Sequence, residues 1–219
     1  MTIPGETANL ICVIDDDADI RGSLDSLLRA TGFAVRTFAT PDEFLACAEA
    51  DHATCLLLDI RLQGADGLDF QKLLSDNLVP VPVILITGHG DIPQTVRGMK
   101  AGAVNFLSKP IDEDALLTSI REAISKDRDR RLAERKGETV RACYELLTPR
   151  EREVMSLVTA GLLNKQVAGQ LGLSEVTVKI HRGNMMRKMQ AQSLADLVRM
   201  AEELGVRDTS AARYRALTQ

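Results

Sequence analysis

The sequence has no long apolar run and few aromatic side chains. Its unbroken apolar stretches, such as LICVI at residues 10–14, are far shorter than the roughly 20 residues that cross a bilayer. No basic segment followed by an apolar one begins the chain, so we expect a cytoplasmic protein with no membrane partner. Aromatic residues make up 3% of the chain, which disfavours binding of RNA or single strands by base stacking.

Cysteine is scarce as well, and its spacing does not match common metal or redox motifs. The four cysteines, Cys12, Cys47, Cys55 and Cys143, include no C-x-x-C pair, and three of them sit inside apolar stretches. The favoured interpretation is small buried side chains in a reducing compartment, with a metal or redox role as the alternative.

The net charge of −4 conceals an acidic half and a basic half. Residues 1–125 contain 9 lysines and arginines against 19 acidic residues, whereas residues 126–219 contain 18 against 12. This split suggests two functions, and the basic half is the candidate for binding a polyanion.

Short apolar segments alternate with segments of helical periodicity over the first 125 residues. The predicted strands are 10–14, 33–38, 54–58, 81–86 and 103–107, and the predicted helices are 18–30, 41–50, 67–76, 91–101 and 112–125. Five such repeats predict a doubly wound α/β domain, in which helices cover both faces of a five-stranded parallel sheet.

The remaining sequence predicts a charged connection and an all-α domain of four short helices. The first of these helices starts with a capping box, in which Thr148 is the N-cap and Glu151 lies three positions on. The charged segment favours a solvated helix, with Gly137 as a plausible break. The predicted division is an N-terminal tail 1–8, an α/β domain 9–125, a charged helical linker 126–142, the all-α domain 143–204 and a C-terminal tail 205–219.

Polar side chains follow four of the predicted strands at their carboxyl ends. Asp15 and Asp16 follow the first strand, Asp59 the third and Thr87 the fourth, and Lys109 comes shortly after the fifth. Because the carboxyl ends of parallel strands lie at one edge of the sheet, we expect these groups to converge. Three carboxylates close together call for a hard cation, and an all-oxygen site suits Mg²⁺.

A carboxylate-bound metal beside a lysine and a hydroxyl is an arrangement for phosphoryl transfer. In this interpretation Asp59 is the nucleophile, Asp16 and Asp59 bind the metal directly, and Asp15 holds it through water. Thr87 and Lys109 then hold the phosphoryl oxygens. Each residue alone has a common structural role, such as capping a helix, so the prediction depends on the ordered combination.

Four segments resemble the receiver domain of two-component response regulators, over essentially all of residues 9–125. They are VIDDD (13–17), LLLDIRLQGADG (56–67), VILITGHGD (83–91) and FLSKP (106–110). The resemblance implies a flavodoxin-like fold and a sensor histidine kinase that donates phosphate to Asp59.

The same resemblance implies roles for further residues. The backbone carbonyl of Arg61 would join Asp16 and Asp59 in binding Mg²⁺, the Lys109–Pro110 peptide would be cis, and Phe106 would be the aromatic switch residue. Gln63 departs from the proline that the family usually has in this loop.

Phosphorylation is expected to act as a switch because it adds charge and acceptor oxygens at Asp59. Thr87 would move inward and vacate space for Phe106, which alters the surface of helix 91–101 and strand 103–107. We expect this face, joined by the last receiver helix, to form a homodimer when the protein is phosphorylated.

The basic half follows the order of a helix-turn-helix: a short helix 164–171, a turn at Gly172 and a longer helix capped by Ser174. The longer helix has an apolar side, where His181 is expected to be a packed structural residue. Its outward side is the candidate reader of the major groove: Lys179, Ile180, Gly183, Asn184 and Arg187, with Thr177 at the edge. The candidates for phosphate contacts are Lys165, Arg182 and Lys188. Gly183 permits close approach to a base pair, or reflects neutral drift.

The segments LTPREREV, NKQVA and TVKIHRGNMMRKMQ resemble the LuxR-type helix-turn-helix domain of the FixJ/NarL subfamily, over residues 146–204. The resemblance implies sequence-specific binding to double-stranded promoter DNA as a dimer, with the helix at 193–204 contributing to dimerisation. RNA polymerase is a further expected partner.

The predicted function is therefore a phosphorylation-activated transcription factor, not an enzyme beyond its own phosphoryl transfer and slow dephosphorylation. The main alternative is a small Mg²⁺-dependent phosphatase with an aspartyl-phosphate intermediate. That class places its nucleophile in an Asp-x-Asp arrangement after the first strand and needs a substrate cap, whereas no cap insertion interrupts residues 9–125. An adaptor that does not bind DNA is disfavoured by the basic half.

Overall fold

The computed structural model describes residues 9–77, 79–88 and 92–207, which fold as two compact units. The first unit is Met1–Arg131 and the second is Leu132–Gln219, so the division falls inside the predicted linker. The predicted tail 1–8 and all but the first three residues of the tail 205–219 lie outside the described residues.

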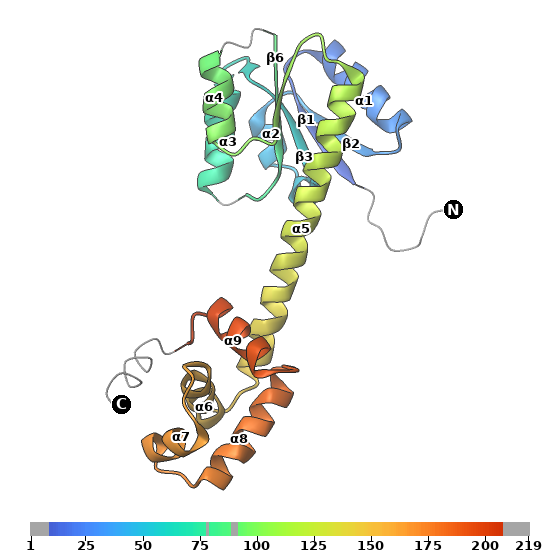
Figure 1. Cartoon of the computed structure of the whole chain (residues 1–219). Coiled ribbons are helices and arrows are strands. Elements are labelled where there is room, and N and C mark those ends of the chain that lie inside the picture. The colour runs from blue at the N-terminus through green and yellow to red at the C-terminus, as the bar shows by residue number, and fades with distance from the viewer. Residues whose placement is uncertain (1–8, 78, 89–91, 208–219) are drawn as a thin grey trace. The chain divides into compact units, whose positions relative to one another are not determined.

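A parallel sheet forms the centre of the first unit (Figure 1). It has five strands in the order β2-β1-β3-β6-β7. The strands are β1 (Leu10–Ile14), β2 (Ala34–Phe38), β3 (Cys55–Asp59), β6 (Val83–Thr87) and β7 (Asn105–Ser108). This order confirms the predicted doubly wound fold. The sequence did not predict the small antiparallel pair of β4 (Arg61–Leu62) and β5 (Ala65–Asp66) that follows β3.

Helices cover both faces of the sheet because successive strand side chains point to opposite faces. Cys12 and Ile14 of β1 pack in one core with residues of α2 (Pro41–Leu45) and α3 (Gly67–Asp76). Ile11 and Val13 pack in the other core with residues of α1 (Ala18–Ala30) and α5 (Glu113–Glu145). Helix α4 (Ile92–Lys100) packs through Gly98, where an added Cβ would lie 2.2 Å from Leu85 Cδ1.

The predicted helix at 41–50 is shorter than expected. It ends at Leu45 and is followed by a 3₁₀ helix, η1 (Ala48–His52), because Cys47 between them has an extended backbone. Burial raises the pKa of the Cys12 thiol to about 12, and the four cysteines are free. Because the thiolate is the reactive form, these features favour the interpretation of Cys12 as a buried core side chain.

Helix α5 runs without a break through Gly137, so the suggested break there is wrong. One glycine in a helix costs about 1 kcal/mol relative to alanine, and the strong helix formers on either side of Gly137 offset this cost. Nor is the start of the charged segment simply solvated. Asp127 is buried and accepts hydrogen bonds of 2.6 Å from both Arg130 and Arg131. Arg131 also donates to the carbonyl of Ala53 at 3.1 Å, which fastens this part of α5 to the first unit.

The second unit is all-α, as predicted. Residues 132–145 of α5 join α6 (Pro149–Thr159), α7 (Asn164–Leu171), α8 (Glu175–Lys188) and α9 (Leu194–Glu203) around a core that includes Val154, Val167, Val178, Met185 and Leu197. The predicted capping box of Thr148 and Glu151 is present. Gly172 ends α7 with a φ of 65°, which a glycine adopts without steric cost. Among the described residues, no helix is long and apolar enough to span a membrane.

Candidate phosphoacceptor site and nucleic-acid interface

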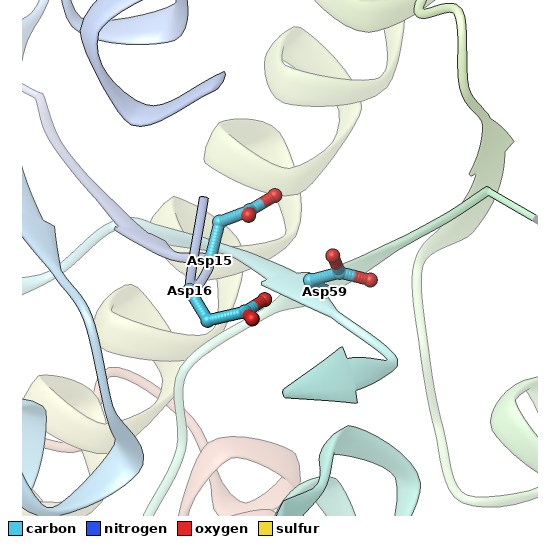
Figure 2. Close-up of side chains that lie close together, drawn as sticks. All are labelled: Asp15, Asp16 and Asp59. Carbon is cyan, nitrogen blue, oxygen red and sulfur yellow. The ribbon is translucent and has the colours of Figure 1, made fainter. Parts of the chain in front are cut away.

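Three carboxylates meet at the carboxyl edge of the sheet (Figure 2). Ligand oxygens of Asp15, Asp16 and Asp59 all lie within 4.8 Å of one another. Ile14 and Leu58 are paired neighbours on β1 and β3, so the acidic residues that come directly after them are side by side. Asp15 and Asp59 are buried and Asp16 is half-buried. The predicted convergence of the three carboxylates is therefore present.

The ammonium of Lys109 lies between two of these carboxylates. Its Nζ donates hydrogen bonds to Asp15 Oδ2 at 2.7 Å and to Asp59 Oδ2 at 2.5 Å. Burial lowers the pKa of Lys109, but the hydrogen bonds to the two carboxylates outweigh burial and raise it. Burial raises the pKa of Asp15 and outweighs the hydrogen bonds from Lys109 and from the backbone of Asp17. The Lys109–Pro110 peptide is cis, as expected.

Thr87 and Phe106 occupy the neighbouring strands β6 and β7. Thr87 is fully buried, and its carbonyl accepts a 2.7 Å hydrogen bond from the backbone of Lys109. Phe106 pairs with Leu85, two positions before Thr87, so Thr87 and Phe106 point to the same face of the sheet. Phe106 is half-buried against the core on that face.

The site has one further neighbour that the sequence analysis named, Arg61, and two that it did not, Gly67 and Arg21. The N–H of Arg61 donates to Asp59 Oδ1 at 3.1 Å, so Arg61 adjoins the site, and the role of its carbonyl as a Mg²⁺ ligand stays a prediction. Gly67 lies against the backbone of Asp59, because an added Cβ at Gly67 would be 2.2 Å from the backbone oxygen of Asp59. Arg21 donates to the carbonyl of Asp15 at 2.6 Å. Only the position of Gly67 at the first turn of a predicted helix could have drawn attention to it.

The predicted outward face of α8 is open, and its apolar side is packed. Val178, Met185 and Met189 are buried, whereas His181 is half-buried. Of the predicted DNA contacts on this helix, Lys179, Ile180, Gly183 and Arg187 are exposed, and Thr177 and Asn184 are half-buried. The hydroxyl of Thr177 already lies 2.8 Å from that of Ser174, the N-cap. Val176, which the sequence analysis did not name, is also exposed on this helix, with an exposed fraction of 67%.

The three side chains predicted to contact phosphates differ in their exposure and in the partners that they already have. Lys165 is exposed near the start of α7. Arg182 is half-buried and donates to Asn164 Oδ1 at 3.2 Å. Lys188 pairs at 2.7 Å with the buried carboxylate of Glu151. Burial of Glu151 raises its pKa, but hydrogen bonds from Lys188 and Thr148 outweigh burial and lower it. Arg182 and Lys188 therefore also tie α8 to α7 and α6.

The chain is similar to known proteins along most of its length. Residues 11–121 match the response regulator receiver domain family, and residues 145–201 match the luxR family of bacterial regulatory proteins. Nodulation protein W of Bradyrhizobium diazoefficiens is 50% identical over 200 residues, which cover 91% of this chain and 88% of that protein. Transcriptional regulatory protein FixJ of the same species is 40% identical over 200 residues, covering 91% and 98%.

Solved structures give the same result. Response regulator StyR is 43% identical with a TM-score of 0.78, and the match covers 90% of this chain and 100% of that one. Full-length FixJ from B. japonicum is 39% identical with a TM-score of 0.53, and the match covers 90% and 97%.

Proposed function

We propose Asp59 as the phosphoacceptor of this chain, which belongs to the two-component response regulators with a receiver domain and a LuxR-type DNA-binding domain. The chain is a transcription regulator similar to FixJ and not a classical enzyme. The domain pair implies a sensor kinase and DNA as partners. The proposed limits are 9–125 for the receiver, 126–142 for the linker and 143–204 for the DNA-binding domain.

The observation that carries the proposal is the position of the Asp59 carboxylate among the other charged groups. It is buried beside Asp15 and Asp16, and Lys109 already holds one of its oxygens at 2.5 Å. An oxygen of Asp59 would form the new bond to phosphorus, while the bond from phosphorus to a histidine nitrogen of the kinase breaks. Lys109 would then neutralise charge on the phosphoryl oxygens, and Thr87 would donate a hydrogen bond to them.

The donor set fits a divalent cation. Three carboxylates bring three negative charges and Lys109 brings one positive charge, so the cluster is left with two uncompensated charges. Asp15, Asp16, Asp59 and the backbone carbonyl of Arg61 are the proposed ligands of Mg²⁺, which suits such all-oxygen sites. When bound, the ion would neutralise charge that develops on the transferring phosphoryl group.

The proposed switch runs from Thr87 to Phe106 and then to a dimer face on α4, β7 and the receiver part of α5. Two observations support this route. Thr87 and Phe106 point to the same face of neighbouring strands. On α4, Val96 and Met99 are exposed apolar side chains, the kind that a homodimer would bury.

The proposed output is binding of double-stranded promoter DNA by the α7–α8 helix-turn-helix, with α8 in the major groove and α9 contributing to the dimer. The proposed base readers are Thr177, Lys179, Ile180, Gly183, Asn184 and Arg187, and the proposed phosphate contacts are Lys165, Arg182 and Lys188. The site of action would be the cytoplasm, with RNA polymerase as a further partner. The basic charge of residues 126–219 supports a polyanionic ligand.

The test compares wild type with Asp59→Asn, each with and without acetyl phosphate and Mg²⁺. Intact-mass measurement should find one phosphoryl adduct that maps to Asp59 in wild type and none in the variant. Binding to genomic DNA fragments should increase with the phosphodonor in wild type only. An adduct on another residue, or equal behaviour of the two proteins, would contradict the proposal.

A further inference from the structure

Two apolar side chains stand next to each other on the outward face of α8. Val176 and Ile180 have exposed fractions of 67% and 57%. They are four residues apart, so they are neighbours one turn apart on the helix surface. The buried side of the same helix is marked by Val178 and Met185, which have exposed fractions of 0%. Neither Val176 nor Ile180 is therefore needed to fill the core of this unit.

The surroundings of the pair are basic and open. Gly183 continues the line of Val176 and Ile180 by a further turn, and an added Cβ there would meet nothing within 4 Å. Lys179 and Arg187 are exposed on the same side of the helix. Single exposed apolar residues are ordinary, but an apolar pair beside the exposed cations Lys179 and Arg187 suits a ligand with both negative charge and apolar groups.

We propose that Val176 and Ile180 determine DNA sequence specificity by contacting thymine methyl groups in the major groove. This inference rests on the proposed function, in which α8 enters that groove. The C5 methyl of thymine is the apolar group that distinguishes A·T pairs at the major-groove edge, and aliphatic side chains contact it. The phosphates on either side account for the basic flanks.

The spacing allows the two side chains to reach different base pairs. Residues four apart are separated by about 6 Å along a helix axis, whereas successive base pairs are about 3.4 Å apart. Val176 and Ile180 therefore contact methyls on separate, closely spaced base pairs. The preferred half-site contains thymines at both positions, and Val176, which lies in the first turn of α8, is a specificity determinant beside the predicted base readers.

The experiment begins with a duplex selected from a random pool by the full-length protein in the presence of acetyl phosphate and Mg²⁺. Each thymine of the selected site is then replaced by deoxyuridine, which removes the methyl group and keeps base pairing. For each contacted methyl that is removed, the affinity of wild type for the duplex should fall about fourfold. This is the expected effect when one buried carbon group is lost from the interface. The dependence of affinity on salt should not change, because phosphate contacts remain.

The variants Val176→Ala and Ile180→Ala then assign the contacts. Each should bind the thymine duplex more weakly, and each should lose discrimination against deoxyuridine at a different position. The matched control is Leu146→Ala, since Leu146 is also 67% exposed but lies outside α8. It should discriminate as wild type does.

The outcomes separate this inference from the function on which it rests. If the protein binds no duplex under any condition, both fail. If it binds a selected duplex but has equal affinity for the thymine and deoxyuridine forms, the methyl contacts are absent and this inference alone is overturned. Discrimination that persists in both alanine variants would also overturn it.

Discussion

Lys109 Nζ lies 2.5 Å from Asp59 Oδ2, although the two residues are 50 positions apart in the sequence. The same nitrogen also lies 2.7 Å from Asp15 Oδ2. One cation therefore joins the ends of β1 and β3 to the segment that follows β7. The charged groups are already arranged around Asp59, so little reorganisation is needed when a phosphoryl group arrives.

Replacing Lys109 by alanine should slow phosphorylation of Asp59 without unfolding the chain. Loss of one preorganised charge-stabilising donor typically costs a factor of about a hundred or more in rate. The rate of adduct formation with acetyl phosphate and Mg²⁺, followed by intact mass, measures this effect. Lys72→Ala, which removes an exposed lysine of α3, is the control and should react at the wild-type rate. Equal rates for the two variants would exclude the proposed role of Lys109.

Gly67→Ala should destabilise the receiver unit and disturb the phosphoacceptor. The added Cβ would lie 2.2 Å from the backbone oxygen of Asp59 and 2.9 Å from Ile60 Cα, so backbone atoms must move. Overpacking of this kind typically costs about 1–3 kcal/mol. Urea unfolding followed by circular dichroism gives the change in free energy of unfolding.

The control for that experiment is Gly22→Ala on α1, where an added Cβ would meet nothing within 4 Å. Because alanine is the better helix former by about 1 kcal/mol, Gly22→Ala should be neutral or stabilising. Opposite signs at Gly67 and Gly22 are the expected result. A neutral effect at Gly67 would mean that the loop after β3 adapts without cost.

The Glu151–Lys188 pair should make the stability of the second unit depend on pH. The folded environment lowers the pKa of Glu151 below its ordinary value of 4.5. Its contribution is therefore complete above pH 4.5 and is lost as the pH falls through the lower, folded pKa. Thermal unfolding between pH 3 and 7 should show that the free energy of unfolding of the second unit falls as the pH decreases. This fall should be smaller by about 1 kcal/mol in Glu151→Gln. Glu153→Gln, in an exposed pair with Arg150, should follow wild type.

The sequence was most informative where a feature repeats or where topology forces convergence. Alternating strands and helices predicted the doubly wound sheet, and the rule for parallel strand ends brought together Asp15, Asp16, Asp59, Thr87 and Lys109. The contact of Gly67 with the Asp59 backbone could not be predicted, because it depends on how the chain returns after β3 through the β4–β5 pair. Val176 was missed for a different reason: an aliphatic residue on a helix is ordinarily assigned to the core.

The charged segment after the receiver gives the clearest case in which composition misled. Its density of Lys, Arg, Asp and Glu favoured a solvated helix, yet Asp127 is buried between Arg130 and Arg131. Arg131 reaches the carbonyls of Ala53 and His52, which precede β3. A residue-by-residue pattern cannot reveal this contact, because the partners are almost 80 positions away in the sequence.

Asp127→Ala should therefore destabilise the first unit, whereas Asp129→Ala should not. Removing Asp127 takes the buried acceptor away from the guanidinium groups of Arg130 and Arg131, and loss of hydrogen bonds to a charged group typically costs about 1.5–3 kcal/mol. Asp129, two residues on, is exposed and makes only a long contact to Arg128, so its loss should cost well under 1 kcal/mol. Hydrogen exchange of the full chain gives the readout: amides of α5 around residues 123–131 should lose protection in Asp127→Ala alone. Equal protection in the two variants would mean that α5 holds to the receiver through its apolar face, with Asp127 contributing nothing measurable.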